Sequence, residues 1–100
     1  MNGIEIMKQS VRVHGADKQR DKIVEEMGEL TTALMQERDG RVSADAVITE
    51  IADVCITAYE LALIYGLEKV EAEIDRKLER LRERMTDKTA PNDIKGSDKE

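Results

Sequence analysis

Residues 22–34 read KIVEEMGELTTAL, and this stretch predicts a helix with one apolar side and one acidic side. Its large apolar residues recur at steps of four, three and four, which places them on one helical stripe: Ile23, Met27, Leu30 and Leu34. Glu26 and Glu29 stand three residues apart, so they share a helical face that begins beside this stripe. We expect Asp17 to cap the N-terminus of this helix and Asp39-Gly40 to close it after Arg38.

The flanking sequence predicts three more helices. The first covers residues 4–14 and ends at Gly15, and the third runs from Ser43, as its N-cap, to Tyr65 before Gly66. The fourth follows at once and has an apolar residue at every third or fourth position: Leu67, Val70, Ile74, Leu78, Leu81 and Met85. The pattern stops there, so we assign residues 1–86 to one helical domain and predict that the polar residues 87–100 form a disordered tail.

The amino-acid composition limits which fold the chain can adopt and which partners it can bind. Charged residues make up 38% of the 100-residue chain and aromatic residues only 2%, so a core must come from aliphatic side chains. The single proline, Pro91, lies beyond the predicted helices, which favours an all-α, four-helix bundle. The net charge of −6 argues against binding nucleic acid polymers. No apolar run is long enough for a membrane span and no signal peptide is evident, so we expect a cytoplasmic protein without membrane contact.

The third predicted helix is apolar over a wide arc. Its apolar residues extend beyond one stripe: Val47, Ile48, Ile51, Val54, Cys55, Ala58, Leu61 and Ala62. A helix of this kind is usually contacted from several sides. A short chain also gains stability by burying apolar surface against a second copy. We therefore expect the bundle to be completed by homo-oligomerisation, as a dimer or a tetramer.

A second acidic pair repeats the spacing of the first. Glu50 and Asp53 lie in the segment EIADV, on the most apolar helix of the chain. If the second and third helices pack together, four carboxylates can meet, and a divalent cation would offset their repulsion. Such hard oxygen ligands suit Mg²⁺ or Mn²⁺. The alternative is a solvated acidic face, since charge-rich helices often carry carboxylates three residues apart by chance.

Three segments in order, KIVEEMGELTTAL, EIADV and YGLEKVEAEIDRKLERL, resemble the MazG-like, all-α nucleoside triphosphate pyrophosphohydrolases over residues 10–85. That family's E-x-x-E and E-x-x-D signature falls on Glu26, Glu29, Glu50 and Asp53, which the resemblance implies are metal ligands for Mg²⁺. It also implies hydrolysis of a nucleoside triphosphate, often a deoxy or non-standard one, to the monophosphate and pyrophosphate.

The resemblance suggests three further roles. Glu25, next to the acidic group, is the candidate to take a proton from the attacking water, with an exposed surface acid as the alternative. Lys77 matches a phosphate-contacting lysine of such proteins, although a lysine that covers apolar neighbours is the alternative. His14 lies where their nucleotide pocket often begins, or is simply an exposed residue at the helix end.

The match departs from the family pattern on the last helix. Leu81 stands where such proteins carry an arginine, which leaves Arg80 or Arg82 as substitutes, and Asp75 stands where an asparagine is common. The sequence also leaves the base open, because the chain has no Trp or Phe to stack on it. Two other functions remain: a non-catalytic helical interaction module, and the same fold acting on phosphoribosyl-ATP.

Overall fold

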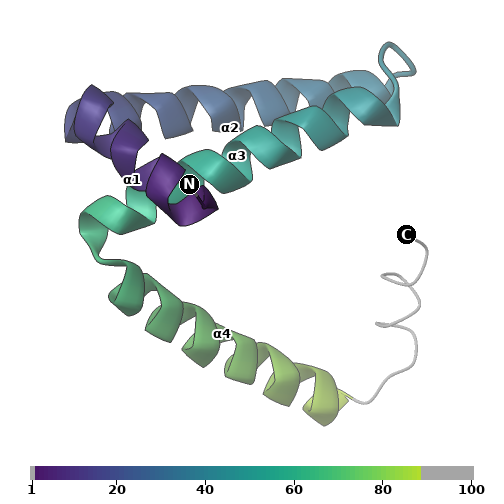
Figure 1. Cartoon of the computed structure of the whole chain (residues 1–100). Helices are drawn as coiled ribbons and strands as arrows, with labels where there is room; N and C mark the ends of the chain where they lie inside the picture. Colours follow the sequence, from purple (N-terminus) through teal and green to yellow (C-terminus); the bar gives the residue numbers. More distant parts are fainter. Residues whose placement is uncertain (1, 89–100) are drawn as a thin grey trace. The chain divides into compact units, whose positions relative to one another are not determined.

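The computed structural model describes residues 2–88, and every regular element in that range is an α-helix. The four helices are α1 (Gly3–His14), α2 (Ala16–Arg38), α3 (Ala44–Tyr65) and α4 (Leu67–Lys88) (Figure 1). The all-α class and the four predicted helices are therefore confirmed. α4 also includes residues 87 and 88, which the prediction assigned to the tail. Residues 89–100, the rest of the predicted tail, lie outside the described residues.

Glycines with positive φ separate the helices. Gly15 has φ 87° and ψ 162°, Gly40 has φ 78° and Gly66 has φ 113°, all conformations that favour glycine. Gly15 ends α1 through a hydrogen bond from its N–H to the Val11 carbonyl, and it is also the N-cap residue of α2. The prediction that Asp17 caps α2 is therefore wrong. One glycine makes the whole α1–α2 corner, so Asp17 already lies in the first turn of α2.

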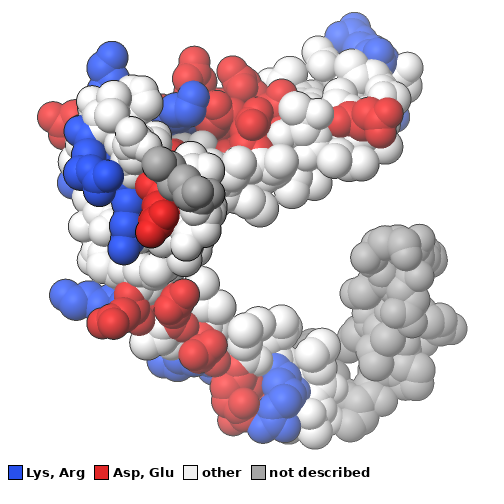
Figure 2. Space-filling model, viewed as in Figure 1, with Lys and Arg blue, Asp and Glu red and all other residues white. Residues whose placement is uncertain are grey.

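The chain divides into two units, which are described separately. The first comprises residues up to Leu67 and contains α1, α2 and α3. In this unit α2 and α3 run antiparallel, side by side, and α1 contacts both (Figure 1). The second unit contains α4, whose surface carries acidic and basic side chains interspersed along its length (Figure 2). Assembly of the four helices into one bundle stays a prediction.

The buried face of α2 differs from the predicted stripe. Ile23 is buried as expected, but Met27 and Leu34 are each about half exposed. The residues buried beside Ile23 are instead Gln19, Glu26 and Ala33. This face is turned from the apolar stripe toward the acidic pair, because α3 packs on that side of α2.

The buried face of α3 likewise includes polar residues. Its buried residues are Val47, Thr57, Glu60 and Ala62, whereas Ile48, Ile51 and Cys55 are exposed. The α2–α3 seam therefore buries as many polar side chains as apolar ones. Burying polar groups costs free energy unless they are hydrogen-bonded or paired, so this seam is not built for stability alone. None of the described helices is long and apolar enough to cross a membrane.

Candidate metal centre and adjoining pocket

The antiparallel register of α2 and α3 sets the geometry of the site. Moving toward the N-terminus of α2, the seam carries Glu29, then Glu26, then Gln19. Moving by the same steps toward the C-terminus of α3, it carries Glu50, then Asp53, then Glu60. The convergence of Glu26, Glu29 and Glu50, and the single pocket that Gln19, Glu26, Asp53 and Glu60 line, agree with this pairing of positions across the seam. The site is therefore a row of polar side chains, with acids at one end and Gln19 opposite Glu60 at the other.

Three of the four predicted metal ligands come together. Glu26, Glu29 and Glu50 each offer a carboxylate oxygen, and these oxygens all lie within 4.8 Å of one another. Glu26 is buried, Glu50 is half-buried and Glu29 is exposed. Acidic side chains gather over the middle of α2 in the space-filling view (Figure 2). Helices α2 and α3 thus hold three carboxylates at a distance where one cation can contact them all.

Two carboxylate oxygens in this group are buried and have no hydrogen-bond partner. They are Oε1 of Glu26 and Oε1 of Glu50. Lys22 lies 3.5 Å from the other oxygen of Glu26, so the one cation paired with the group within residues 2–88 leaves Oε1 unpartnered. A buried charged oxygen without a partner is costly. These two atoms separate the cluster from an ordinary solvated acidic face, and a hard divalent cation would satisfy both.

The mutual repulsion of the acids raises the pKa of Glu29. The largest cause is the charge of Glu26, followed by desolvation and then by the charges of Glu50 and Glu25. A raised carboxyl pKa means that the cluster resists carrying its full negative charge without a counterion. Titratable groups perturbed by their neighbours are typical of functional sites, although structural clusters show the same effect.

Asp53 and Glu25 line different pockets, each of which also includes members of the three-acid group. Asp53 shares a pocket with Glu26 but is not among the three carboxylates that converge. The Thr57 hydroxyl donates a 2.7 Å hydrogen bond to the Asp53 carbonyl oxygen, in the turn that faces this pocket. Glu25 is exposed and lines a second, more open pocket together with Glu29 and Glu50. Its place beside the acids fits the predicted role, which stays a prediction.

The pocket that contains Asp53 has a volume of about 400 Å³. Helices α1, α2 and α3 all contribute to its wall: Ser10, His14, Lys18, Gln19, Lys22, Glu26, Asp53, Ile56, Thr57 and Glu60. This volume is within the range of small-molecule sites, about 300–1,000 Å³. His14 therefore lies at a pocket, as the prediction requires. Its Nδ1 lies 2.9 Å from the Ser10 carbonyl oxygen, to which it donates a hydrogen bond.

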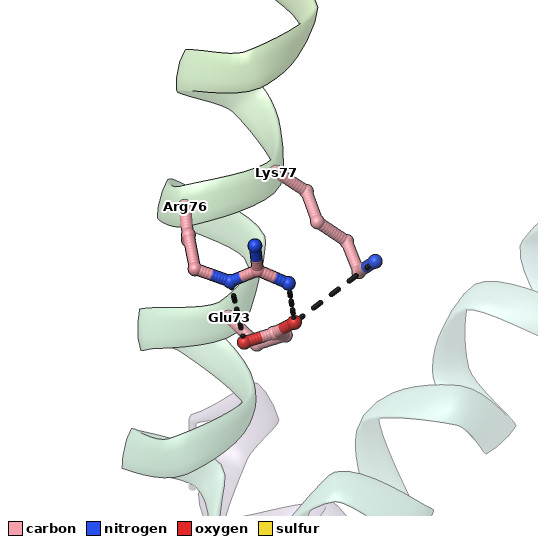
Figure 3. Close-up of polar contacts among 3 residues, drawn as sticks. All are labelled: Glu73, Arg76 and Lys77. Carbon is pink, nitrogen blue, oxygen red and sulfur yellow. Dashed lines mark hydrogen bonds and ion pairs between the residues drawn. The ribbon is translucent and has the colours of Figure 1, made fainter.

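Lys77 lies on α4, in the second unit. Its Nζ is 3.9 Å from Oε2 of Glu73, a carboxylate that also accepts hydrogen bonds from the Arg76 guanidinium (Figure 3). Arg76 lowers the pKa of Glu73, mainly through this hydrogen bond. The described contacts thus place Lys77 in an exposed ion-pair group on one helix, and its contact with phosphate stays a prediction.

Sequence reasoning missed the polar residues that extend the row beyond the acids. Gln19 and Lys22 precede Glu26 by seven and four residues, and Thr57 and Glu60 follow Asp53 by four and seven. All four therefore share a helical face with a predicted metal ligand, a signal visible in the sequence. They were missed because the buried face was placed on the apolar stripe.

Comparison of the chain with protein-family models, curated proteins and solved structures gives no significant match.

Proposed function

We propose that this chain is a Mg²⁺-dependent nucleoside triphosphate pyrophosphohydrolase of the MazG-like kind. The observation that carries the proposal is the pair of buried, unpartnered oxygens on Glu26 and Glu50, at the point where the three carboxylates converge. A non-catalytic module would have no need of such a cluster, since its acids could extend into solvent. The four-acid signature and its resemblance to this family then favour phosphate chemistry over other uses of a cation.

In this proposal Glu26, Glu29, Glu50 and Asp53 hold Mg²⁺, or Mn²⁺ in its place. When bound, the cation would neutralise phosphate charge and polarise the α-phosphorus for attack by water. Glu25 would accept the proton of that water from its position beside Glu29 and Glu50. Lys22, 3.5 Å from Glu26 and on the wall of the 400 Å³ pocket, is placed to contact a phosphate oxygen as well. Glu26 and Lys22 together would orient the substrate at the metal end of the pocket.

The nucleoside would occupy the pocket lined by α1, α2 and α3. Glu26 and Asp53 line one part of this pocket, so a ligand held there by its phosphates would extend away from the acids along the seam. His14 borders the same pocket and would contact the nucleoside. The second pocket, on the Glu25 side, has a volume of about 510 Å³ and would be the exit for pyrophosphate.

The proposal includes a homo-oligomer, either a dimer or a tetramer. It is supported by the large apolar side chains that α2 and α3 leave about half exposed, among them Met27, Leu34, Ile48 and Ile51. Covering such surface is the usual reason for obligate association. A cytoplasmic location and the lack of nucleic acid polymers as partners belong to the same proposal.

The direct test is incubation with a panel of ribo- and deoxynucleoside triphosphates and Mg²⁺, followed by assay of pyrophosphate and nucleoside monophosphate. We expect cleavage of at least one triphosphate. Glu29→Gln and Asp53→Asn should reduce turnover by more than the roughly 10- to 100-fold that loss of an outer-shell partner of a metal costs. Glu37→Gln, at an exposed position near the end of α2, is the control and should retain full activity.

A folded protein that cleaves no triphosphate with either Mg²⁺ or Mn²⁺ would contradict the proposal. If phosphoribosyl-ATP alone were cleaved, the proposed metal site would be retained, and phosphoribosyl-ATP would replace a nucleoside triphosphate as the proposed substrate. Binding of a protein partner without turnover, unaffected by Glu29→Gln, would favour the interaction module instead.

A further inference from the structure

The 400 Å³ pocket contains a buried amide whose oxygen has no hydrogen-bond partner among residues 2–88. Gln19 is only 1% exposed, and its Oε1 is buried without a hydrogen-bond partner. An amide is expensive to bury in this state, because its carbonyl oxygen has lost water and gained nothing. Its position on the pocket wall means that a ligand could supply the missing donor. Gln19 therefore offers an unpaired acceptor to a ligand bound in this pocket.

Glu60 provides a second acceptor on the opposite side of the same pocket. It is 6% exposed, it lines the pocket, and none of the ion pairs found within residues 2–88 includes it. The antiparallel register places it across the seam from Gln19. An ionised carboxylate only accepts hydrogen bonds, whereas an amide both donates and accepts. The two buried groups together therefore present mainly acceptors.

The distance of these groups from the acids matches the proposed substrate. Gln19 lies seven residues before Glu26, and Glu60 lies seven residues after Asp53, which is about 10 Å along each helix. If the phosphates are held at the acids, a ribose or deoxyribose fills the intervening part and the base reaches Gln19 and Glu60. This step rests on the proposed function, because it takes the position of the phosphates from it.

The pocket wall also indicates how a base would be selected. Among the described residues no Trp, Tyr or Phe lines it; its one aromatic ring is the imidazole of His14, and Ile56 is its one large apolar residue. Selection must then come from hydrogen bonds more than from stacking. Gln19 alone does not discriminate, because its amide can be turned over to offer either its oxygen or its NH₂ group. Glu60 does discriminate, because a carboxylate repels a carbonyl oxygen and accepts from an amino group.

We propose that Gln19 and Glu60 are the specificity-determining residues, and that they select a nucleobase with an exocyclic amino group, such as cytosine or adenine, over uracil or thymine. The amino group donates to Glu60 and to the Gln19 carbonyl oxygen, and the Gln19 NH₂ group donates to the adjacent ring nitrogen. Asn and Gln pair with the amino and ring-nitrogen edge of adenine in this way elsewhere.

The test measures binding of deoxynucleosides to the full chain in metal-free buffer by NMR titration. This measurement needs neither metal nor turnover. We expect deoxycytidine or deoxyadenosine to bind about tenfold tighter than deoxyuridine and thymidine, since a good pair of hydrogen bonds discriminates by about this factor or more. Glu60→Gln should bring the four affinities to within about threefold, because the new amide can donate to a carbonyl oxygen. Gln19→Met should weaken binding of the amino-bearing nucleosides, and Glu37→Gln should change nothing.

Equal binding of deoxycytidine, deoxyadenosine and deoxyuridine by the native chain, or no binding of any nucleoside, would overturn the proposal. Retention of the full preference in both Glu60→Gln and Gln19→Met would do the same. Should a variant fail to fold, the comparison of nucleosides on the native chain still decides. Cleavage of all four deoxynucleoside triphosphates at equal rates would reject base selection while leaving the hydrolase in place. Amino-selective nucleoside binding without any cleavage would reject the hydrolase alone.

Discussion

Glu26 carries a carboxylate at a position where a helix seam usually has an aliphatic residue. It is 8% exposed, one of its oxygens contacts Lys22, and the other has no partner. Two more acids stand within reach of it. A protein under selection for stability alone would replace such a residue, because buried unpaired charge is among the most costly features of a fold. The cost at Glu26 is therefore the strongest residue-level sign of function.

The pKa of Glu29 leads to a prediction about pH. Because Glu26 and its neighbours raise this pKa in the folded state, the folded chain binds the proton more tightly than the unfolded chain does. The contribution of Glu29 to the stability of the metal-free protein should then be greatest below the ordinary pKa of a glutamate and fall as the pH rises through the raised value. Glu29→Gln should reduce this fall, as seen in urea unfolding followed by circular dichroism from mildly acidic to neutral pH.

Addition of Mg²⁺ to the native chain at neutral pH is the complementary measurement. A ligand that binds only the folded state stabilises it by about 2.7 kcal/mol at a hundred times its dissociation constant. The native chain should show such a shift with Mg²⁺, and Glu29→Gln a smaller one. A native chain that is equally stable at both ends of the pH range, and indifferent to Mg²⁺, would mean that the acids do not act as a group.

Two glycines have different structural roles in these helices. Gly15 lies at φ 87° and ψ 162°, a backbone region almost restricted to glycine, and it makes the α1–α2 corner. Gly28 lies inside α2, has no need of a positive φ, and has open space where a side chain would begin. It borders the second pocket, beside Glu25 and Glu29. One glycine is thus required by the fold, and the other leaves room at the site.

Replacing Gly15 and Gly28 by alanine, one at a time, should distinguish these two roles. Gly28→Ala should stabilise the chain by about 1 kcal/mol, because glycine is a poor residue inside a helix and the added methyl meets no atom. Gly15→Ala should destabilise it by about 1–3 kcal/mol, since alanine cannot adopt that φ and ψ without strain. Thermal unfolding of both variants is the measurement, and a shift of the same sign in both would contradict this account of the α1–α2 corner.

On the scale of the whole molecule, the first unit buries polar and apolar side chains alike and leaves large apolar side chains exposed. The α2–α3 seam buries Gln19, Glu26, Thr57 and Glu60, while Ile48 and Ile51 of α3 remain about half exposed. Single exposed apolar residues are ordinary, but exposed apolar residues on several turns of a helix pair support the proposed oligomer.

Sedimentation of the purified chain should therefore give the mass of a dimer or a tetramer. Ile48→Glu and Ile51→Glu should each shift the chain toward monomer, because a charge placed in an apolar interface must be desolvated. Thr49→Glu, at an exposed position between them whose hydroxyl donates a hydrogen bond to the Asp45 carbonyl, is the matched control. A native chain that sediments as a monomer at every concentration would refute the oligomer.

The sequence by itself determined the helices and the composition of the acidic group. Apolar steps of three and four, together with Gly15, Gly40 and Gly66, fix where helices begin and end, because these are local properties of the backbone. The spacing of each acidic pair likewise follows from the helical repeat alone.

Only the tertiary structure decided which face of each helix is buried. A helix usually packs its apolar stripe against a neighbour, because this removes the most apolar surface from water. Sequence reasoning therefore placed Met27 and Leu34 in the core. In the first unit, α2 and α3 pack on faces that include polar as well as apolar residues, which brings Glu26, Glu29 and Glu50 together and buries Gln19 and Glu60. The physical reason is that burial depends on what a neighbouring helix contacts, and the periodicity of a single helix contains no information about its neighbour's orientation.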